Sequence, residues 1–106
     1  MKPEIDIASS AHDLGLLREA KDLTMDGWQV FANKLKGFKK PPRIAGLIPD
    51  LYAIKNGRVK IVSIETLAFE NEQRHSLFRL HAQQNHLIRY YGWIVDEEGR
   101  RTQRFD

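Results

Sequence analysis

The chain has 106 residues, a net charge of +3 and no cysteine. This length fits one domain, which we expect to span residues 1–106. No apolar run approaches the roughly 18 residues of a membrane-spanning helix, and the N-terminus lacks the apolar stretch of a signal peptide. The absence of cysteine excludes disulfides and thiolate metal sites. We therefore expect a cytoplasmic protein that does not act in a membrane.

The first periodic segment predicts a helix. Ser9, Ser10 and Asp13 are candidate N-cap residues, and Gly27 is a suitable residue to end the helix. Between them, apolar residues recur at helical spacing and form one stripe. The stripe consists of Leu16, Leu17, Ala20 and Leu23.

A strand is expected at 28–35, where aromatic, β-branched and polar residues mix. The segment that follows, 37–42, contains two adjacent prolines, which exclude a helix interior or a central strand. No acidic residue lies between Asp26 and Asp50, so this window is strongly basic. Its cations, which we expect to contact a nucleic-acid backbone, are Lys34, Lys36, Lys39, Lys40 and Arg43.

A second basic group closes the chain and consists of Arg100, Arg101 and Arg104. Two basic clusters on a small domain suit binding to phosphates. The alternative interpretation is a solvated loop together with a frayed tail.

Two apolar-rich runs, 51–55 and 58–65, are joined by Asn56-Gly57. Asn-Gly between such runs is the strongest short signal for a β-hairpin, because a type I′ turn needs positive φ at both central positions. A two-residue turn also fixes which residues of the two runs face each other.

Counting back from the turn places Asp50 opposite Ser63, and Glu65 lies on the same face two residues later. The diagonal distance from Asp50 to Glu65 should be roughly 7–8 Å, within reach of a shared ion. Carboxylates near an apolar sheet are costly unless they are solvated, paired or bound to a cation. Mg²⁺ or Mn²⁺ is the natural candidate, since both prefer oxygen ligands. The alternative is that Asp50 caps one strand and Glu65 ends another in solvent.

A second helix is expected over 70–85, with an inward-facing side formed by Leu77, Phe78, Leu80 and Ala82. His75 is expected on its surface. Residues 88–95 are rich in β-branched and aromatic side chains and predict the last strand. For its aromatic residues, stacking on bases and packing in the core both remain open, with core packing favoured.

The predicted order is helix, three strands, helix, strand. It indicates an α/β fold with a mixed sheet of about four strands flanked by helices.

Two segments, GLIPDL at 46–51 and IVSIET at 61–66, resemble the paired motif of the PD-(D/E)XK nuclease superfamily. In that pattern a Pro-Asp opens one strand, and an acid, any residue and a lysine end the next. The element order also resembles that of small Holliday-junction resolvase-like and VRR-type nuclease domains. The resemblance implies a restriction-endonuclease-like core and a metal-dependent endonuclease, a hydrolase of phosphodiesters that acts on DNA.

The resemblance also implies roles for individual residues. Asp50 stands at the metal-binding aspartate, Ser63 at the second acid and Glu65 at the lysine. Glu19 resembles an acid that some relatives add to the metal site, and Gln73 resembles a glutamine that others place near it. These five are the candidate catalytic residues, with Asp50 and Glu65 as the metal ligands for Mg²⁺ or Mn²⁺.

Two of these positions depart from the motif. Serine is a weak neutral ligand, and glutamate cannot supply the positive charge of lysine. Some restriction enzymes of this fold nevertheless use glutamate at the lysine position, and others recruit a glutamate from the following helix. Glu70 and Glu72 are candidates for such recruitment, although acids also suit an exposed helix N-terminus.

Three functions remain open. The first is metal-dependent cleavage of nucleic acid, with DNA favoured over RNA. The second is a catalytically inactive module that binds nucleic acid or a protein partner, and the third is an unrelated α/β interaction domain. Because a domain this small spans little of a duplex, a homodimer is compatible with the first two.

Overall fold

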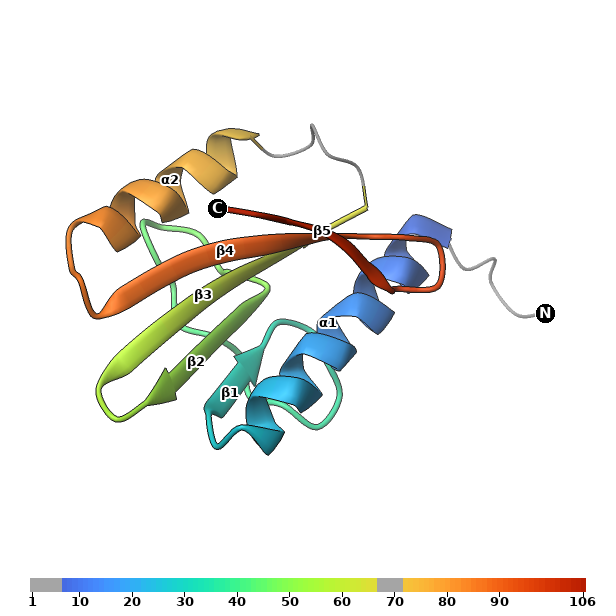
Figure 1. Ribbon diagram of the computed structural model, residues 1–106, viewed down its shortest axis with the longest axis horizontal. Helices are drawn as coiled ribbons and strands as arrows, with labels where there is room; N and C mark the ends of the chain where they lie inside the picture. The colour runs from blue at the N-terminus through green and yellow to red at the C-terminus, as the bar shows by residue number, and fades with distance from the viewer. Residues whose placement is uncertain (1–6, 67–71) are drawn as a thin grey trace.

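The computed structural model describes residues 7–66 and 72–106. Within these residues five strands form one mixed sheet in the order β1-β2-β3-β4-β5, together with two helices (Figure 1). The elements are α1 (Ile7–Met25), β1 (Gln29–Ala32), β2 (Leu51–Lys55), β3 (Arg58–Glu65), α2 (Glu72–Gln83), β4 (Ile88–Val95) and β5 (Arg101–Phe105). The predicted α/β fold is therefore confirmed, with one strand more than expected.

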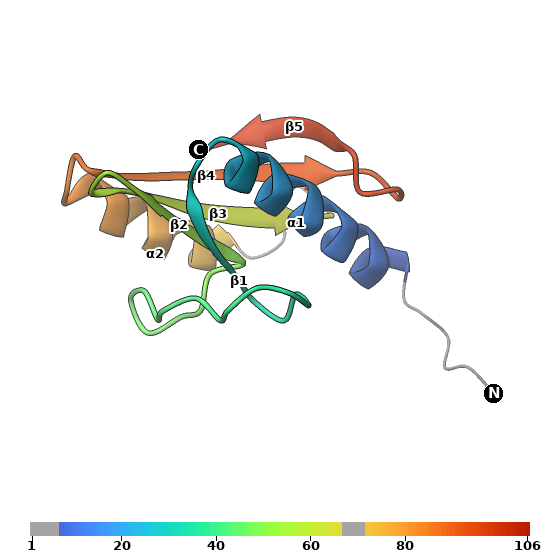
Figure 2. The same cartoon turned by 90° about the horizontal axis from the view of Figure 1, so that it is seen from below.

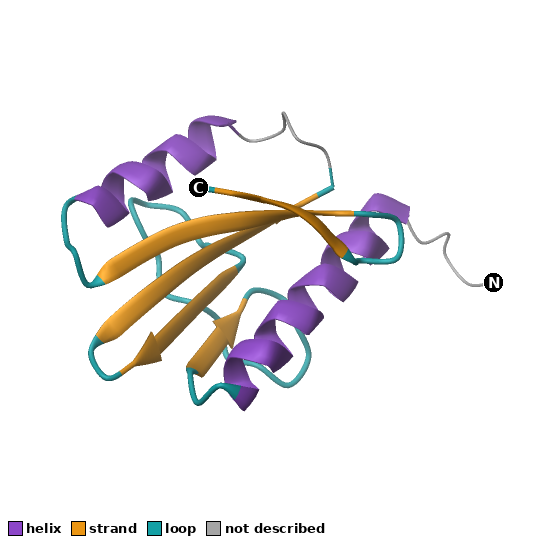
Figure 3. Cartoon of the chain, viewed as in Figure 1, coloured by secondary structure: helices purple, strands orange, loops and turns teal. Residues whose placement is uncertain are grey.

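The two helices cover opposite faces of the sheet, which lies between them (Figures 2 and 3). Because successive side chains of a strand point to opposite faces, neighbouring residues of β3 enter different cores. Val62 packs in the cluster that contains Leu16 of α1, whereas Ile61 packs with Phe78 of α2. The segment 33–50, which links β1 to β2 and is called the connector below, adds Ile44 to the α2 side. Neither described helix is both long enough and apolar enough to cross a bilayer.

Helix α1 ends where the sequence predicted. Gly27 has φ of 90°, and its N–H donates to the carbonyl of Thr24 at 3.0 Å. The N–H of Trp28 donates to the carbonyl of Leu23 at 2.9 Å, which completes a Schellman motif. The start of α1 was predicted wrongly. The helix begins at Ile7, so all three N-cap candidates (Ser9, Ser10 and Asp13) lie inside it.

The β2–β3 hairpin has the predicted register. Pairing runs from Lys55 opposite Arg58 back to Leu51 opposite Val62. Asn56 and Gly57 have φ of 50° and 76°, as a type I′ turn requires. Strand β4 also has the predicted bounds and pairs in parallel with β3. The strand expected at 28–35 is confirmed over the shorter range of β1.

Helix α2 faces the sheet with only part of the side that was predicted, since Phe78 and Ala82 pack in the core on this side but the other two predicted residues do not. Phe78 is fully buried, but Leu77 and Leu80 are 37% and 55% exposed. His75, expected on the surface, is 2% exposed. The reason is that Glu65 of β3 provides a buried hydrogen-bond partner for His75, so a polar residue occupies the inward side.

Strand β5 was not predicted, because the arginines of its segment were interpreted as a basic tail. A turn at Gly99, with φ of 76°, returns the chain to pair antiparallel with β4. Phe105 is paired with Gly92, and its ring occupies the space above that glycine. The aromatic ring also lies 4.8 Å from that of His75, centroid to centroid. Phe105 of β5 thus packs on the α2 side of the sheet.

Gly92→Ala should destabilise the protein by about 1–3 kcal/mol, because the added methyl group overpacks the site. A Cβ at Gly92 would lie 2.2 Å from Cζ of Phe105. Urea unfolding of Gly92→Ala, Phe105→Leu and the double variant measures this coupling. We expect the double variant to lose less stability than the sum of the single losses. Additive losses would contradict the close packing of β5 on β4.

Candidate functional site

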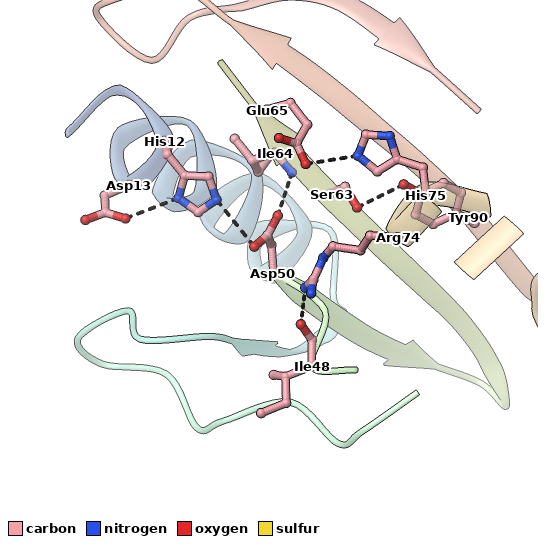
Figure 4. Close-up of polar contacts among 10 residues, drawn as sticks. All are labelled: His12, Asp13, Ile48, Asp50, Ser63, Ile64, Glu65, Arg74, His75 and Tyr90. Carbon is pink, nitrogen blue, oxygen red and sulfur yellow. Dashed lines mark hydrogen bonds and ion pairs between the residues drawn. The ribbon is translucent and has the colours of Figure 1, made fainter. Parts of the chain in front are cut away.

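Asp50 ends the connector immediately before β2, preceded by the buried Pro49. Its Oδ2 accepts a hydrogen bond from the backbone N–H of Ile64 at 2.9 Å. Its Oδ1 lies 3.3 Å from Nε2 of His12, on α1 (Figure 4). Both carboxylate oxygens therefore contact donors within the protein. One of these contacts ties the connector to β3 and the other ties it to α1.

Ser63 and Glu65 project from β3 toward α2 and are 0% and 6% exposed. The hydroxyl of Tyr90 donates to Oγ of Ser63 at 2.9 Å. Oε1 of Glu65 lies 2.9 Å from Nε2 of His75. In Figure 4, Asp50 turns toward His12 while Glu65 turns toward His75. The hairpin brings Asp50, Ser63 and Glu65 to one end of the sheet, but their side-chain oxygens contact different partners.

Glu19 is buried on the α1 side of the sheet. Its Oε2 accepts the hydroxyl of Tyr91 at 2.5 Å, and its Oε1 lies 2.6 Å from a guanidinium nitrogen of Arg101. Burial and the acceptor Glu19 together raise the pKa of Tyr91. Glu19 lies seven residues after His12 on α1, which is about 10 Å along the helix axis. It therefore joins Tyr91 and Arg101 rather than the group around Asp50.

The remaining candidates belong to the second helix. Gln73 is exposed in the first turn of α2. Glu72 is also exposed, with Oε1 3.6 Å from Arg79 and Oε2 3.8 Å from Nδ1 of His75. Glu70 lies outside the described residues. The carboxylate of Glu72 is thus directed toward Arg79 and His75 of its own helix.

The described residues do not fit the metal site that the resemblance implies. They contain no group of three or more His, Asp or Glu side chains placed to hold an ion. Mg²⁺ requires several oxygen ligands in near-octahedral arrangement. The carboxylates of Asp50 and Glu19 each contact two donors, and Glu65 contacts His75. A shared ion would have to displace these protein contacts.

The connector carries cations that remain available. Lys34, Lys36, Lys39, Lys40 and Arg43 are all exposed. None of them forms an ion pair with a carboxylate of residues 7–66 or 72–106. The N–H of Asn33 donates to the carbonyl of Asp50 at 2.8 Å, so the two ends of this basic segment meet beside the predicted site.

The second basic group is used differently. Arg101 contacts Asp22 at 2.6 Å in addition to Glu19. Arg100 pairs with Asp96 at 2.9 Å, and Arg104 lies 3.7 Å from Asp106. These arginines hold β5 and its turn through ion pairs within the protein, so they are less available to phosphates than the connector.

Sequence reasoning missed His12 as the partner of Asp50. The signal was its spacing, because His12 lies one turn before Leu16 on the buried stripe of α1. It also left the role of the aromatic residues in β4 open. Tyr90 and Tyr91 are buried, one on each face, and each donates its hydroxyl to a predicted site residue.

No protein-family model, no curated protein and no solved structure matches this chain. The site is therefore interpreted from its own geometry.

The pKa of His12 should lie well above the ordinary value for a histidine. Its hydrogen bond to Asp50 is the main cause that raises its pKa from 6.5 to about 9, with Asp13 adding to the effect and burial opposing it. Because the pKa of His12 is higher in the folded state than in the unfolded state, the His12–Asp50 pair contributes its full stabilisation of the fold below pH 6.5. This contribution is lost as pH rises through about 9. NMR titration of the imidazole measures the pKa directly.

Asp50→Asn is the matched variant, because its side-chain oxygen still accepts the Ile64 amide while the charge beside His12 is lost. We expect this variant to lower the His12 pKa. An equal pKa in the wild type and Asp50→Asn would show that the two side chains do not interact.

Proposed function

We propose that this protein is a catalytically inactive, nuclease-like module that binds nucleic acid, with DNA as the favoured ligand. One observation carries the proposal: the carboxylates at the predicted catalytic positions contact donors of the protein itself. Asp50 contacts His12 and the Ile64 amide, and Glu65 contacts His75.

Metal-dependent hydrolysis of a phosphodiester needs carboxylates that share an ion, which then activates water and stabilises the charge that develops. At this site the second acid is replaced by Ser63, whose hydroxyl accepts from Tyr90. The lysine is replaced by Glu65, and the nearby guanidinium of Arg74 donates to the carbonyl of Ile48. Within residues 7–66 and 72–106, no group of three potential ligands converges at the site, and a glutamate stands at the lysine position of the motif.

Binding is supported by the charge of the connector. Its five exposed cations lack carboxylate partners among the described residues, so a polyanion would not have to compete with internal ion pairs. Neutralising phosphates releases counterions, which makes such binding favourable at low salt and independent of sequence. A chain without cysteine suits a reducing compartment, so the proposal keeps a cytoplasmic location. A homodimer would extend the length of duplex contacted.

Lys39→Gln/Lys40→Gln should weaken binding to a short fluorescein-labelled DNA duplex. If both lysines contact phosphates, the slope of log affinity against log salt should fall by about 2, since each contact contributes about 0.9. Fluorescence anisotropy over about 50–200 mM salt measures the slope. Arg18→Gln/Lys21→Gln is the matched control, because it removes the same charge from exposed positions on α1.

Equal losses in the connector variant and the α1 control would contradict a role for the connector.

The same proteins are incubated with Mn²⁺ and with branched, single-stranded and double-stranded DNA. We expect intact substrate throughout. Cleavage by the wild type that disappears in Asp50→Ala would overturn the proposal and restore a nuclease.

A further inference from the structure

A second cationic surface lies at the end of the sheet where β3 and β4 begin, at the left of Figure 1. The parallel register sets Lys60 beside Arg89, so both project from the α1 face. Arg58 lies two residues before Lys60 and shares that face. Helix α1 ends at Met25, and Trp28 follows its terminal turn. Trp28 stands over this corner of the sheet, with its ring centroid 4.6 Å from Nζ of Lys60.

These residues line a groove of about 550 Å³. Four arginine or lysine side chains contribute to it (Arg58, Lys60, Arg79 and Arg89), against one acidic residue, Asp106. Arg79 contacts Glu72 and the carbonyl of Asp106. The other three form no ion pair with any carboxylate that the structure describes. The groove therefore carries an excess of unneutralised positive charge.

The groove also follows an open strand edge. Strand β5 pairs with β4 only from Gly92 to Val95, so among the described residues Ile88, Arg89, Tyr90 and Tyr91 have no partner strand on that side. The lining consequently comes from both faces of the sheet, with Trp28 on one side and α2 on the other. A single extended anionic chain is the simplest ligand for a cavity of this volume lined by these cations.

We propose that this groove binds a single-stranded nucleic acid, with phosphates at Arg58, Lys60 and Arg89 and an unpaired base on the indole of Trp28. A basic groove with an aromatic side chain is the usual combination in proteins that bind single strands. Lys60 covers the indole through a cation–π contact in the free protein. On binding, the base takes the place of the ammonium group, and Lys60 turns to a phosphate in the same groove.

This inference rests on the proposed function and specifies its ligand. Arg58 and Glu65 are the first and last residues of β3, seven residues apart and therefore separated by about 23 Å. A strand held in the groove lies far from the predicted catalytic positions, in agreement with binding without cleavage. Trp28 lies directly before the first residue of β1, whereas the connector follows its last residue, Ala32. The two basic surfaces therefore lie at opposite ends of β1 and are separate.

Trp28 supplies a direct readout, because the chain has only two tryptophans. In a Trp93→Phe background its emission reports on the groove alone. We expect oligo(dT) or oligo(U) to quench this emission, and the comparison of the two identifies DNA or RNA as the preferred source. Arg58→Gln/Arg89→Gln should lower the salt dependence of single-strand binding by about 1.4, since each phosphate contact contributes about 0.7 on single strands. Arg18→Gln/Lys21→Gln again serves as the control.

The outcomes separate the two proposals. Quenching that is lost in the Arg58/Arg89 variant but kept in the control supports the groove. If the Arg58→Gln/Arg89→Gln variant and the Arg18→Gln/Lys21→Gln control bind single strands equally well, the groove proposal is overturned. The proposed function still stands in that case, provided that Lys39→Gln/Lys40→Gln weakens duplex binding. Failure of the wild type to bind any nucleic acid overturns both. Tighter binding of a poly-glutamate peptide than of either oligonucleotide would also overturn the inference, because it would assign the open β4 edge to a peptide strand.

Discussion

The type I′ turn at Asn56 and Gly57 sets the register on which the polar end of the molecule depends. With positive φ at both residues, the hairpin closes without slippage, and Asp50 reaches the amide of Ile64. A slip of one residue would turn every β3 side chain to the other face. Glu65 would then lose His75, and Ser63 would lose Tyr90. The same turn places Arg58 at the opposite end of β3, so the hairpin fixes both surfaces.

The contacts around the carboxylates carry the proposal that this site does not bind a metal ion. A buried polar group without a partner costs about 1–3 kcal/mol, so Glu65 and Ser63 must be hydrogen-bonded for the sheet to be stable. In a metal enzyme the ion would supply part of that compensation. Here the compensation comes from His75 for Glu65 and from Tyr90 for Ser63, while the Ile64 amide and His12 contact Asp50. The groups that would bind an ion instead connect the sheet to both helices.

The sequence predicted local features well and distant partners poorly. The hairpin, β4 and the end of α1 depend on turn residues and periodicity that lie within a few positions of each other. Strand β5 was missed because Arg101 and Arg104 break the apolar alternation of a typical strand, and because the carboxylates that pair with Arg101, Glu19 and Asp22, lie far away in the sequence. Glu19 and Arg101 are 82 residues apart in the sequence, so no spacing of residues predicts their contact. The buried side of α2 was misjudged because His75 is stabilised by Glu65, not by its own hydrophobicity.

The central claim is that Asp50 and Glu65 are held by protein donors and do not share a divalent ion. Titration of the wild type with Mn²⁺, followed through the amide resonances, tests it most directly, because the paramagnetic ion broadens nearby signals. We predict that the amides of Ser63, Ile64 and Glu65 broaden no more than those of β1 and the end of α1. Selective broadening of these three amides that disappears in Asp50→Asn would contradict the claim, since it would place the ion at this site.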